Sequence, residues 1–314
     1  MIGLISYFAF FLTVALIFGI VTLGLDLQWG KTGIFNAGVV GFYAIGAYGF
    51  AILTAPASPA FLGNFGLPWA VGIFGAMLIS AFAALLVGLA TIRLRDDYLS
   101  VASFGIAITI QLIVTNWQPM TGGTMGIGQL PNPTRGLFEV RLWNGIAYLG
   151  LVATVLALVC YALARMTRSP WGRVLRAMRE DEPAARTLGK NTVAFRLQCF
   201  VIGSTLMGLG GALYASFTGF VSPADFLPIV TFLVWTMLIV GGSGNALGAL
   251  LGAILVWGIW SMLGAAIARF MPVGLQAQAG AVQAMFIGIV LVLVLLFRPR
   301  GLVGEAPTTS RTSR

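Results

Sequence analysis

The chain has 314 residues, of which 59% are hydrophobic and only 9% charged, and its net charge is +9. Soluble globular proteins carry about 25% charged residues, so this composition excludes a water-facing surface over most of the molecule and predicts a protein embedded in lipid. Its lack of histidine excludes histidine-based catalysis and histidine-ligated metals, and two cysteines argue against a disulfide framework.

The apolar windows predict the membrane spans, because a bilayer core ~30 Å thick needs about 20 helical residues at 1.5 Å each. In chain order these windows are 4–25, 33–54, 69–92, 98–117, 146–164, 197–217, 246–268 and 279–297. A ninth stretch, Pro228–Val240, has 13 residues, and we expect a half-helix there unless it starts at Ser222 and Pro223. The first 25 residues lack a basic leader and are interpreted as a retained span.

These windows predict an all-α fold, a polytopic transmembrane helical bundle of eight to ten segments, some of them short or broken, with no soluble domain. Residues 1–300 would form one transmembrane domain, and 301–314 a short cytoplasmic tail. The basic residues indicate its orientation. Segment 165–196 holds eight basic and three acidic residues, a net charge of +5, and the tail from Arg298 carries +3. Because Lys/Arg-rich loops remain cytoplasmic, we place both segments inside and expect no nucleic-acid partner.

Counting crossings from these two segments places the remaining loops. Four spans separate the basic loop from the tail, so the Gly241–Asn245 turn lies on the cytoplasmic side as well. The uncharged loop 55–68, the glycine-rich loop 118–144 and the N-terminus are predicted to lie outside.

The basic loop itself predicts two helices. Ser169 and Pro170 are an N-cap and first helical residue, and Pro183 starts a second helix that Gly189 ends. An apolar stripe at helical spacing comprises Trp171, Val174, Leu175 and Met178. Arg173, Arg176 and Arg179 lie on another face, followed by the acidic run 180–182. A helix lying on anionic lipid is one interpretation, but the acidic run favours a docking element for a soluble partner.

The run Ser169–Glu182 (SPWGRVLRAMREDE), followed by Ala184, Ala185 and Gly189, resembles the coupling segment of LivM-type permeases, the membrane subunits of branched-chain amino acid ABC importers. Four further motifs are similar to this family and occur in the same order: 24–33 with 44–48, Arg95–Leu99, 121–127 and 241–248. The resemblance covers about residues 20–300. Asp96, Ile108, Gln111 and Ala249 depart from the family pattern.

The resemblance implies a permease subunit in a bacterial inner (plasma) membrane, in contact with lipid. Its implied partners are a second, LivH-type permease, two ATPase subunits that bind ATP and Mg²⁺, and a periplasmic solute-binding protein, while this chain would hold no cofactor or metal. The residues that would couple transport to the ATPases are Trp171, Gly172, Arg173, Arg176, Arg179, Glu180, Glu182, Ala184, Ala185 and Gly189.

Candidate residues for the translocation pathway cluster at breaks in the apolar pattern. Asp26, Asn36 and Gly38 flank the first break, and Gly241 and Gly242 mark a possible counterpart. Interrupted helices expose backbone groups that can hold a zwitterion, although the glycines could serve packing alone and Asp26 could lie in interfacial water. Thr121, Gly122 and Gly123 would meet a binding protein outside, or form an ordinary flexible loop.

Two further features of the sequence are not assigned a site role. The Gly30-Lys31-Thr32 sequence does not fit a phosphate-binding loop. That motif has four residues between its glycines, whereas five residues, including bulky Leu, Gln and Trp, lie between Gly24 and Gly30. Tyr43, Trp117, Trp143 and Trp235 are expected to anchor or pack.

A urea or short-amide ABC importer is the rival within the transporter class. An ion-coupled secondary transporter would favour carboxylates buried within the spans, and this chain offers Asp26 and Asp225 only at span edges. A membrane enzyme would need a nucleophile–base pair or a metal cluster, for which the sequence offers no candidate.

Overall fold

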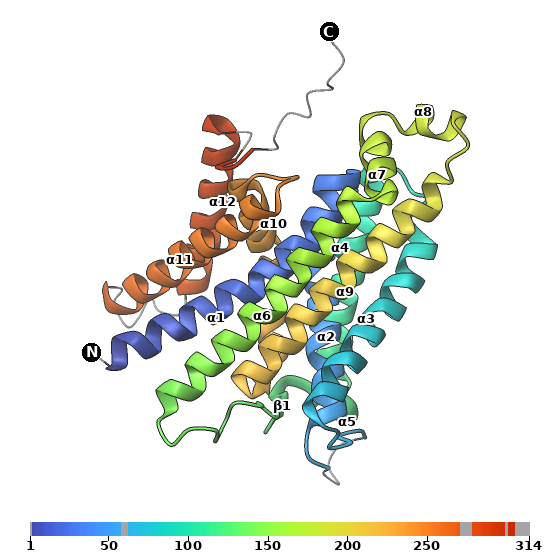
Figure 1. Cartoon of the computed structure of the whole chain (residues 1–314). Coiled ribbons are helices and arrows are strands. Elements are labelled where there is room, and N and C mark those ends of the chain that lie inside the picture. The colour runs from blue at the N-terminus through green and yellow to red at the C-terminus, as the bar shows by residue number, and fades with distance from the viewer. Residues whose placement is uncertain (1, 58–61, 271–277, 299–300, 305–314) are drawn as a thin grey trace.

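The computed structural model describes residues 2–57, 62–270, 278–298 and 301–304, and it consists of long, tilted helices (Figure 1). The helices are α1 (Ile2–Leu25), continued by the π-helix η1 (Asp26–Gly30), α2 (Val39–Thr54), α3 (Trp69–Thr91), α4 (Asp96–Asn116), α5 (Gln118–Thr121), the 3₁₀ turn η2 (Gly123–Met125), α6 (Arg141–Arg168), α7 (Pro170–Glu180), α8 (Glu182–Thr187), α9 (Thr192–Thr218), the 3₁₀ turn η3 (Pro223–Phe226), α10 (Ile229–Gly241), α11 (Ala246–Phe270) and α12 (Ala279–Phe297). Two short strands, β1 (Ile127–Gly128) and β2 (Phe220–Val221), pair antiparallel.

Seven of the described helices are long and apolar enough to cross a membrane, and α2 and α10 are shorter apolar helices. These nine segments agree with the nine predicted from hydropathy, so the prediction of an all-α polytopic bundle is confirmed. The chain is a multi-pass membrane protein.

The second predicted span, 33–54, is wrong at its start. Its helix begins at Val39, and residues 33–38 are an irregular, mostly buried connection. Gly33 takes a positive φ of 75°, and the side chain of Asn36 accepts the backbone N–H of Gly38 at 2.8 Å. These local bonds compete with the first helical turn, although hydropathy alone does not distinguish this stretch from a helix.

Two other spans extend beyond their apolar windows. Helix α6 runs to Arg168 rather than residue 164, with Arg165 in its last turn, where cations complement the helix dipole. Helix α9 begins at Thr192, ahead of its apolar window at 197. The sequence Asn191-Thr192 predicts a helix cap there, and this is confirmed, because the Asn191 side chain accepts the N–H of Ala194 at 3.1 Å. Polar helix ends of this kind lie outside a hydropathy window by definition.

Helix α10 is the short half-helix that the sequence predicts. The alternative start at Ser222 is wrong, because Ser222 and Asp225 form a capping box at the start of the separate turn η3, which ends before α10 begins. The 13 residues of α10 rise only ~20 Å, less than the ~30 Å of a bilayer core.

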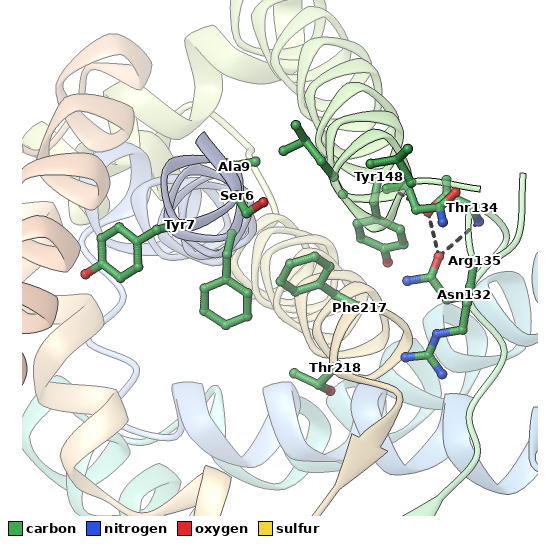
Figure 2. A pocket seen from close by; sticks show the side chains of 14 residues that line it. Ser6, Tyr7, Ala9, Asn132, Thr134, Arg135, Tyr148, Phe217 and Thr218 are labelled. Atoms are coloured by element: carbon green, nitrogen blue, oxygen red, sulfur yellow. Dashed lines mark hydrogen bonds between the residues drawn. The ribbon is translucent and has the colours of Figure 1, made fainter. Parts of the chain in front are cut away.

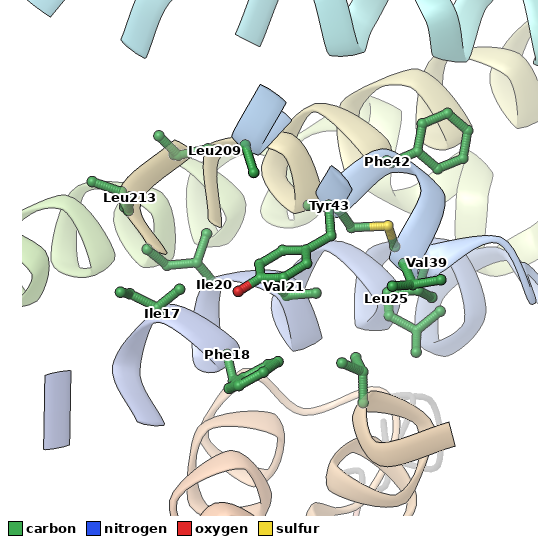
Figure 3. Packing of buried hydrophobic residues seen from close by; sticks show 14 of the residues in the cluster. Ile17, Phe18, Ile20, Val21, Leu25, Val39, Phe42, Tyr43, Leu209 and Leu213 are labelled. Atoms are coloured by element: carbon green, nitrogen blue, oxygen red, sulfur yellow. The ribbon is translucent and has the colours of Figure 1, made fainter. Parts of the chain in front are cut away.

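Glycines bring the central helices into backbone contact. A Cβ atom at Gly46 of α2 would collide with the carbonyl oxygen of Gly208 on α9, and one at Gly252 of α11 would collide with that of Met237 on α10. Around these contacts, branched side chains of α1 and α9 pack against α2 (Figure 3). The bundle therefore uses small residues where membrane helices approach most closely.

The bundle has two distinct ends. Helices α7 and α8 lie at one end, which we call the α7 end, and β1 and α5 lie at the other, the β1 end (Figure 1). Residues 302 and 303 also lie at the α7 end, because the backbone N–H groups of Leu302 and Val303 bond to the last turn of α10. The placement of the basic loop and the start of the tail at one end is therefore confirmed; residues 305–314 of the predicted tail lie outside the described residues.

Candidate functional site

The first break, η1, buries a polar network. The Gln28 side chain is fully buried, and its amide nitrogen donates to Phe200 O at 2.8 Å and Ser204 Oγ at 3.1 Å. Its amide oxygen accepts from Asn36 Nδ2 at 2.8 Å. Single π-helical turns inside α-helices are frequent at functional sites, and here the turn directs Gln28 at α9. The buried amides are satisfied within the chain.

Residues 33–38 join this network to α4 and α10. The carbonyl of Asn36 accepts from Trp235 Nε1 of α10 at 3.0 Å, and the N–H of Ala37 donates to Ser103 Oγ of α4 at 3.0 Å. A Cβ atom at Gly38 would press on the carbonyl oxygen of Ser103. Gly38 therefore permits the close approach of α4, and Asn36 holds the start of α2 against α10.

The two predicted breaks meet in space. Asp26 is 4% exposed, and its Oδ1 accepts the N–H of Gly244 at 2.6 Å, while Lys31 Nζ donates to the Gly244 carbonyl. We call residues 26–31 and 241–244 together the junction. Gly242 adopts a φ of 106° and Gly241 packs against Gly248, so the turn after α10 needs both glycines.

Helix α7 is attached directly to the junction. Arg179 Nη1 donates to the carbonyl of Gly30 at 2.5 Å, while Leu175 and Met178 bury their side chains beneath the helix. Gly172 lies against the backbone of Thr167, where no side chain would fit.

The start of α7 is held in two ways. Trp171 Nε1 donates to Gln198 Oε1 at 2.9 Å. Ser169 marks the helix start as predicted, but its hydroxyl donates backward to Met166 O instead of capping the helix. Because the hydroxyl is engaged by the preceding helix, the expected side-chain cap is wrong.

Helix α8 is stabilised by its own charges. Asp181 accepts the N–H of Ala184 at 2.9 Å and caps the helix. Glu182 pairs with Arg186 at 2.7 Å and Arg196 at 3.0 Å. Burial alone would raise the pKa of the Glu182 carboxyl, but the hydrogen bonds and positive charges outweigh burial and lower that pKa. Glu182 is thus engaged inside the chain before any partner binds.

The predicted coupling residues divide into two groups. Gly172 and Ala185 are buried, Trp171, Arg176 and Glu182 are half-buried, and Arg179 contacts the junction. The remaining residues are exposed together with Leu188, and we call them the α7–α8 surface: Arg173, Glu180, Ala184, Leu188 and Gly189. Leu188 is 77% exposed. This surface combines both charges with two apolar side chains, Ala184 and Leu188.

The Thr121-Gly122-Gly123 segment at the β1 end forms a compact turn. Thr121 is 4% exposed, and its hydroxyl bonds to the carbonyls of Val114 and Trp117. Gly122 and Gly123 have positive φ angles of 75° and 55°. The turn continues into β1, which pairs with β2. It therefore presents a defined surface at this end.

Residues 7–295 match the family described as "Branched-chain amino acid transport system / permease component". The chain belongs to this permease family. LivM of Salmonella typhimurium, a high-affinity branched-chain amino acid transport permease, is 32% identical over 93% of the chain and 68% of its own length. A probable LivM of Methanocaldococcus jannaschii is 28% identical over 92% and 90%, and LivH of Salmonella typhimurium is 25% identical over 76% and 79%. The resemblance seen in the motifs is confirmed.

The permease also has a wide groove at the β1 end, which the sequence does not predict. It encloses about 950 Å³ between the first turns of α1, the start of α6 and the end of α9 (Figure 2). Asn132 and Thr134 form one wall and bond to each other. Tyr148 lines the groove, but its hydroxyl is occupied by Leu213 O at 2.8 Å.

The sequence does not predict the hydrogen-bond partners of the junction and of residues 33–38. It indicates Lys31 only as part of a phosphate-binding motif and Trp235 as an anchor or packing residue, whereas Trp235 is 5% exposed and donates to the Asn36 carbonyl. Ser103 and Thr231 bond to the start of α2. Ser103 and Thr231 can be found in the sequence as isolated polar residues within apolar spans, since polar groups at membrane depth need partners.

Proposed function

We propose that this permease forms one half of the translocation pathway of an ATP-driven importer for branched-chain amino acids in a bacterial inner membrane. A LivH-type permease forms the other half. Two ATPase subunits bind the α7–α8 surface in the cytoplasm, and a periplasmic binding protein delivers the solute at the β1 end. Family membership supports the permease role, and the similarity to both LivM and LivH supports a pair of homologous permeases.

The connection between α7 and the junction is the observation that carries this proposal. A partner on the α7–α8 surface contacts a helix that is packed by Leu175 and Met178 and bonded through Arg179 to Gly30. Gly30 belongs to the break that also holds Gly244 through Asp26. A displacement of α7 is therefore transmitted to both breaks, first through the Arg179–Gly30 hydrogen bond and then through the Asp26–Gly244 hydrogen bond.

ATP binding can shift the transporter between conformations only by its different affinity for them. Rigid structural elements must transmit that difference in affinity from the ATPases to the translocation pathway. The Glu182 ion pairs stiffen α8, and the charged hydrogen bonds at Asp26 and Arg179 are of the stronger, charge-assisted kind. Segment 170–187 is therefore suited to move as a single body.

ATP and Mg²⁺ bind in the partner subunits in this proposal. The only nucleotide-like sequence of the chain, Gly30-Lys31-Thr32, is engaged elsewhere: Gly30 ends the π-helix, Lys31 donates to Gly244, and Thr32 donates to Gln28. A phosphate-binding loop would need free backbone N–H groups at a helix start, and this segment lies at a helix end.

The test is ATP-dependent uptake of radiolabelled leucine into proteoliposomes that contain this chain, its LivH-type partner, both ATPases and the binding protein. We expect accumulation with ATP and none with a non-hydrolysable analogue. Accumulation driven by a proton or sodium gradient without ATPases would contradict the proposal and support an ion-coupled transporter. Competition by excess urea, without competition by isoleucine, would instead support the urea importer.

A further inference from the structure

A small cavity lies among α1, α2, α9, α10, α11 and η3, away from the junction. It encloses about 140 Å³, and its walls include Phe18, Tyr43, Asp225 and Trp257. No lysine or arginine is among the described residues that line it. An apolar cavity of ~150 Å³ holds a molecule the size of benzene, so this cavity is of the size class of small organic solutes.

Two hydrogen-bond donors of this cavity lack partners. Tyr43 is only 2% exposed, and neither its hydroxyl nor the indole Nε1 of Trp257 bonds to a protein atom. Figure 3 shows Tyr43 extending from α2 toward Phe18 of α1. By contrast, the buried hydroxyl of Tyr148 donates to Leu213 O. Buried donors without partners are rare and destabilising unless a ligand or water supplies an acceptor.

Asp225 contributes a negative charge to the wall of the cavity. Its Oδ2 accepts from Ser222 N at 3.0 Å and Ser222 Oγ at 3.2 Å. The carboxylate is also hydrogen-bonded to the side chain of Tyr214, while no arginine or lysine lines the cavity to neutralise it. Aromatic rings surround the same space: the Phe18 ring centroid lies 5.0 Å from that of Trp257 and 5.9 Å from that of Tyr43. A carboxylate beside aromatic faces favours an ammonium group.

We propose that this cavity binds an aliphatic amino acid in its zwitterionic form on the way through the permease. The α-ammonium group contacts Asp225 and the aromatic faces, and the α-carboxylate accepts from Tyr43 and Trp257. The branched side chain packs on Ile229 and Leu233, which complete the apolar wall. This inference rests on the proposed function and names the residues that contact its solute.

Helices α10 and α2 connect the cavity to the junction, because α10 ends at Gly241 and Asn36, which precedes α2, bonds to Gln28. On α10, Leu233 lines the cavity and Trp235 bonds to Asn36. On α2, Tyr43 lies three residues after Val40, whose N–H donates to Thr231 of α10. A displacement of the junction therefore changes the spacing of α2 and α10 at the cavity, which links the solute site to α7.

The test measures leucine binding and transport on matched variants. Tyr43→Phe removes an unpartnered hydroxyl, and Tyr148→Phe removes a partnered one. We expect Tyr43→Phe to leave the unfolding temperature of the purified permease pair unchanged or higher and to lower leucine uptake at least tenfold. Tyr148→Phe should lower the unfolding temperature and keep uptake within twofold. Asp225→Asn should lower uptake like Tyr43→Phe, whereas Ser222→Ala, which removes the hydroxyl bonds of the capping box but keeps the Asp225 carboxylate, should keep uptake within twofold.

A direct readout separates this inference from the proposed function. The wild-type permease pair in detergent, without ATPases or binding protein, should gain thermal stability with millimolar leucine, and less with 4-methylpentanoate, which lacks the amino group. Asp225→Asn should abolish the gain. A water-filled cavity predicts no gain in the wild type, and that result overturns the inference, as does wild-type uptake in Tyr43→Phe and Asp225→Asn. A wild-type complex that binds leucine but fails to import it would overturn the proposed function alone.

Discussion

Replacing Arg179 by glutamine tests the contact between α7 and the junction. The guanidinium donates to the Gly30 carbonyl at 2.5 Å in a partly buried position. Hydrogen bonds to charged groups contribute about 1.5–3 kcal/mol, and partial exposure places this one at the lower limit. Since ~1.4 kcal/mol corresponds to a tenfold change in an equilibrium constant, the substitution should weaken the coupling of α7 to the junction by about tenfold.

The assay compares leucine uptake and ATP hydrolysis in the same proteoliposomes. Arg179→Gln should assemble with the ATPases and hydrolyse ATP, but import about tenfold less leucine per ATP. Arg173→Gln is the matched control, because Arg173 is exposed on the same helix; it should alter ATPase affinity and keep the leucine-to-ATP ratio. An unchanged ratio in Arg179→Gln would refute the reasoning.

Three further predictions concern the α7–α8 segment, the packing and the orientation. Glu180→Lys should reduce co-purification of the ATPases and leave membrane insertion normal, because Glu180 is exposed. Glu182→Gln should instead increase hydrogen exchange in α8, because Glu182 pairs with Arg186 and Arg196. Equal effects of the two substitutions would contradict this division. The lowered pKa of Glu182 means that its ion pairs stabilise α8 above the ordinary glutamate pKa of ~4.3 and are lost as pH falls below it. Amide hydrogen exchange in α8, corrected for intrinsic rates, should therefore rise on acidification. Glu182→Gln should remove that rise. Gly46→Leu should prevent folding and Gly105→Leu should not, because only Gly46 faces the Gly208 carbonyl while Gly105 has open space; equal membrane levels would contradict the packing. With Cys160 and Cys199 replaced, Leu62→Cys should react with an impermeant maleimide in intact cells and Leu188→Cys only after permeabilisation. Both positions are exposed; Leu62 bonds to Pro119 of α5, and Leu188 directly follows α8. The reverse pattern would overturn the orientation.

The parts of the fold that local physics determines could be predicted from the sequence. Apolar length predicts most spans, and the periodic Leu175 and Met178 predict the buried face of α7. The start of α2 could not be predicted, because residues 33–38 are apolar enough to resemble a helix. Their irregular course depends on contacts of Ala37 with Ser103 and of Asn36 with Trp235, and hydropathy carries no information about such pairs.

The candidate site was predicted only in outline. Asp26 and the Gly241–Gly242 turn were recognised as two separate breaks, but their contact joins residues 218 positions apart. The sequence favours an anchoring or packing role for Tyr43, since aromatic residues in spans commonly serve these roles. Its missing hydrogen-bond partner became visible only when α1, α2 and α11 were placed together.

A double-mutant cycle at the junction tests the central claim most directly. The measured quantity is leucine imported per ATP hydrolysed for Arg179→Gln, Asp26→Asn and the double variant. If α7 acts on the Gly244 turn through the shared junction, the two substitutions interrupt one series of contacts, and the double variant should be no worse than the worse single variant. Independent losses that multiply in the double variant would show that α7 and the Gly244 turn do not act through one junction.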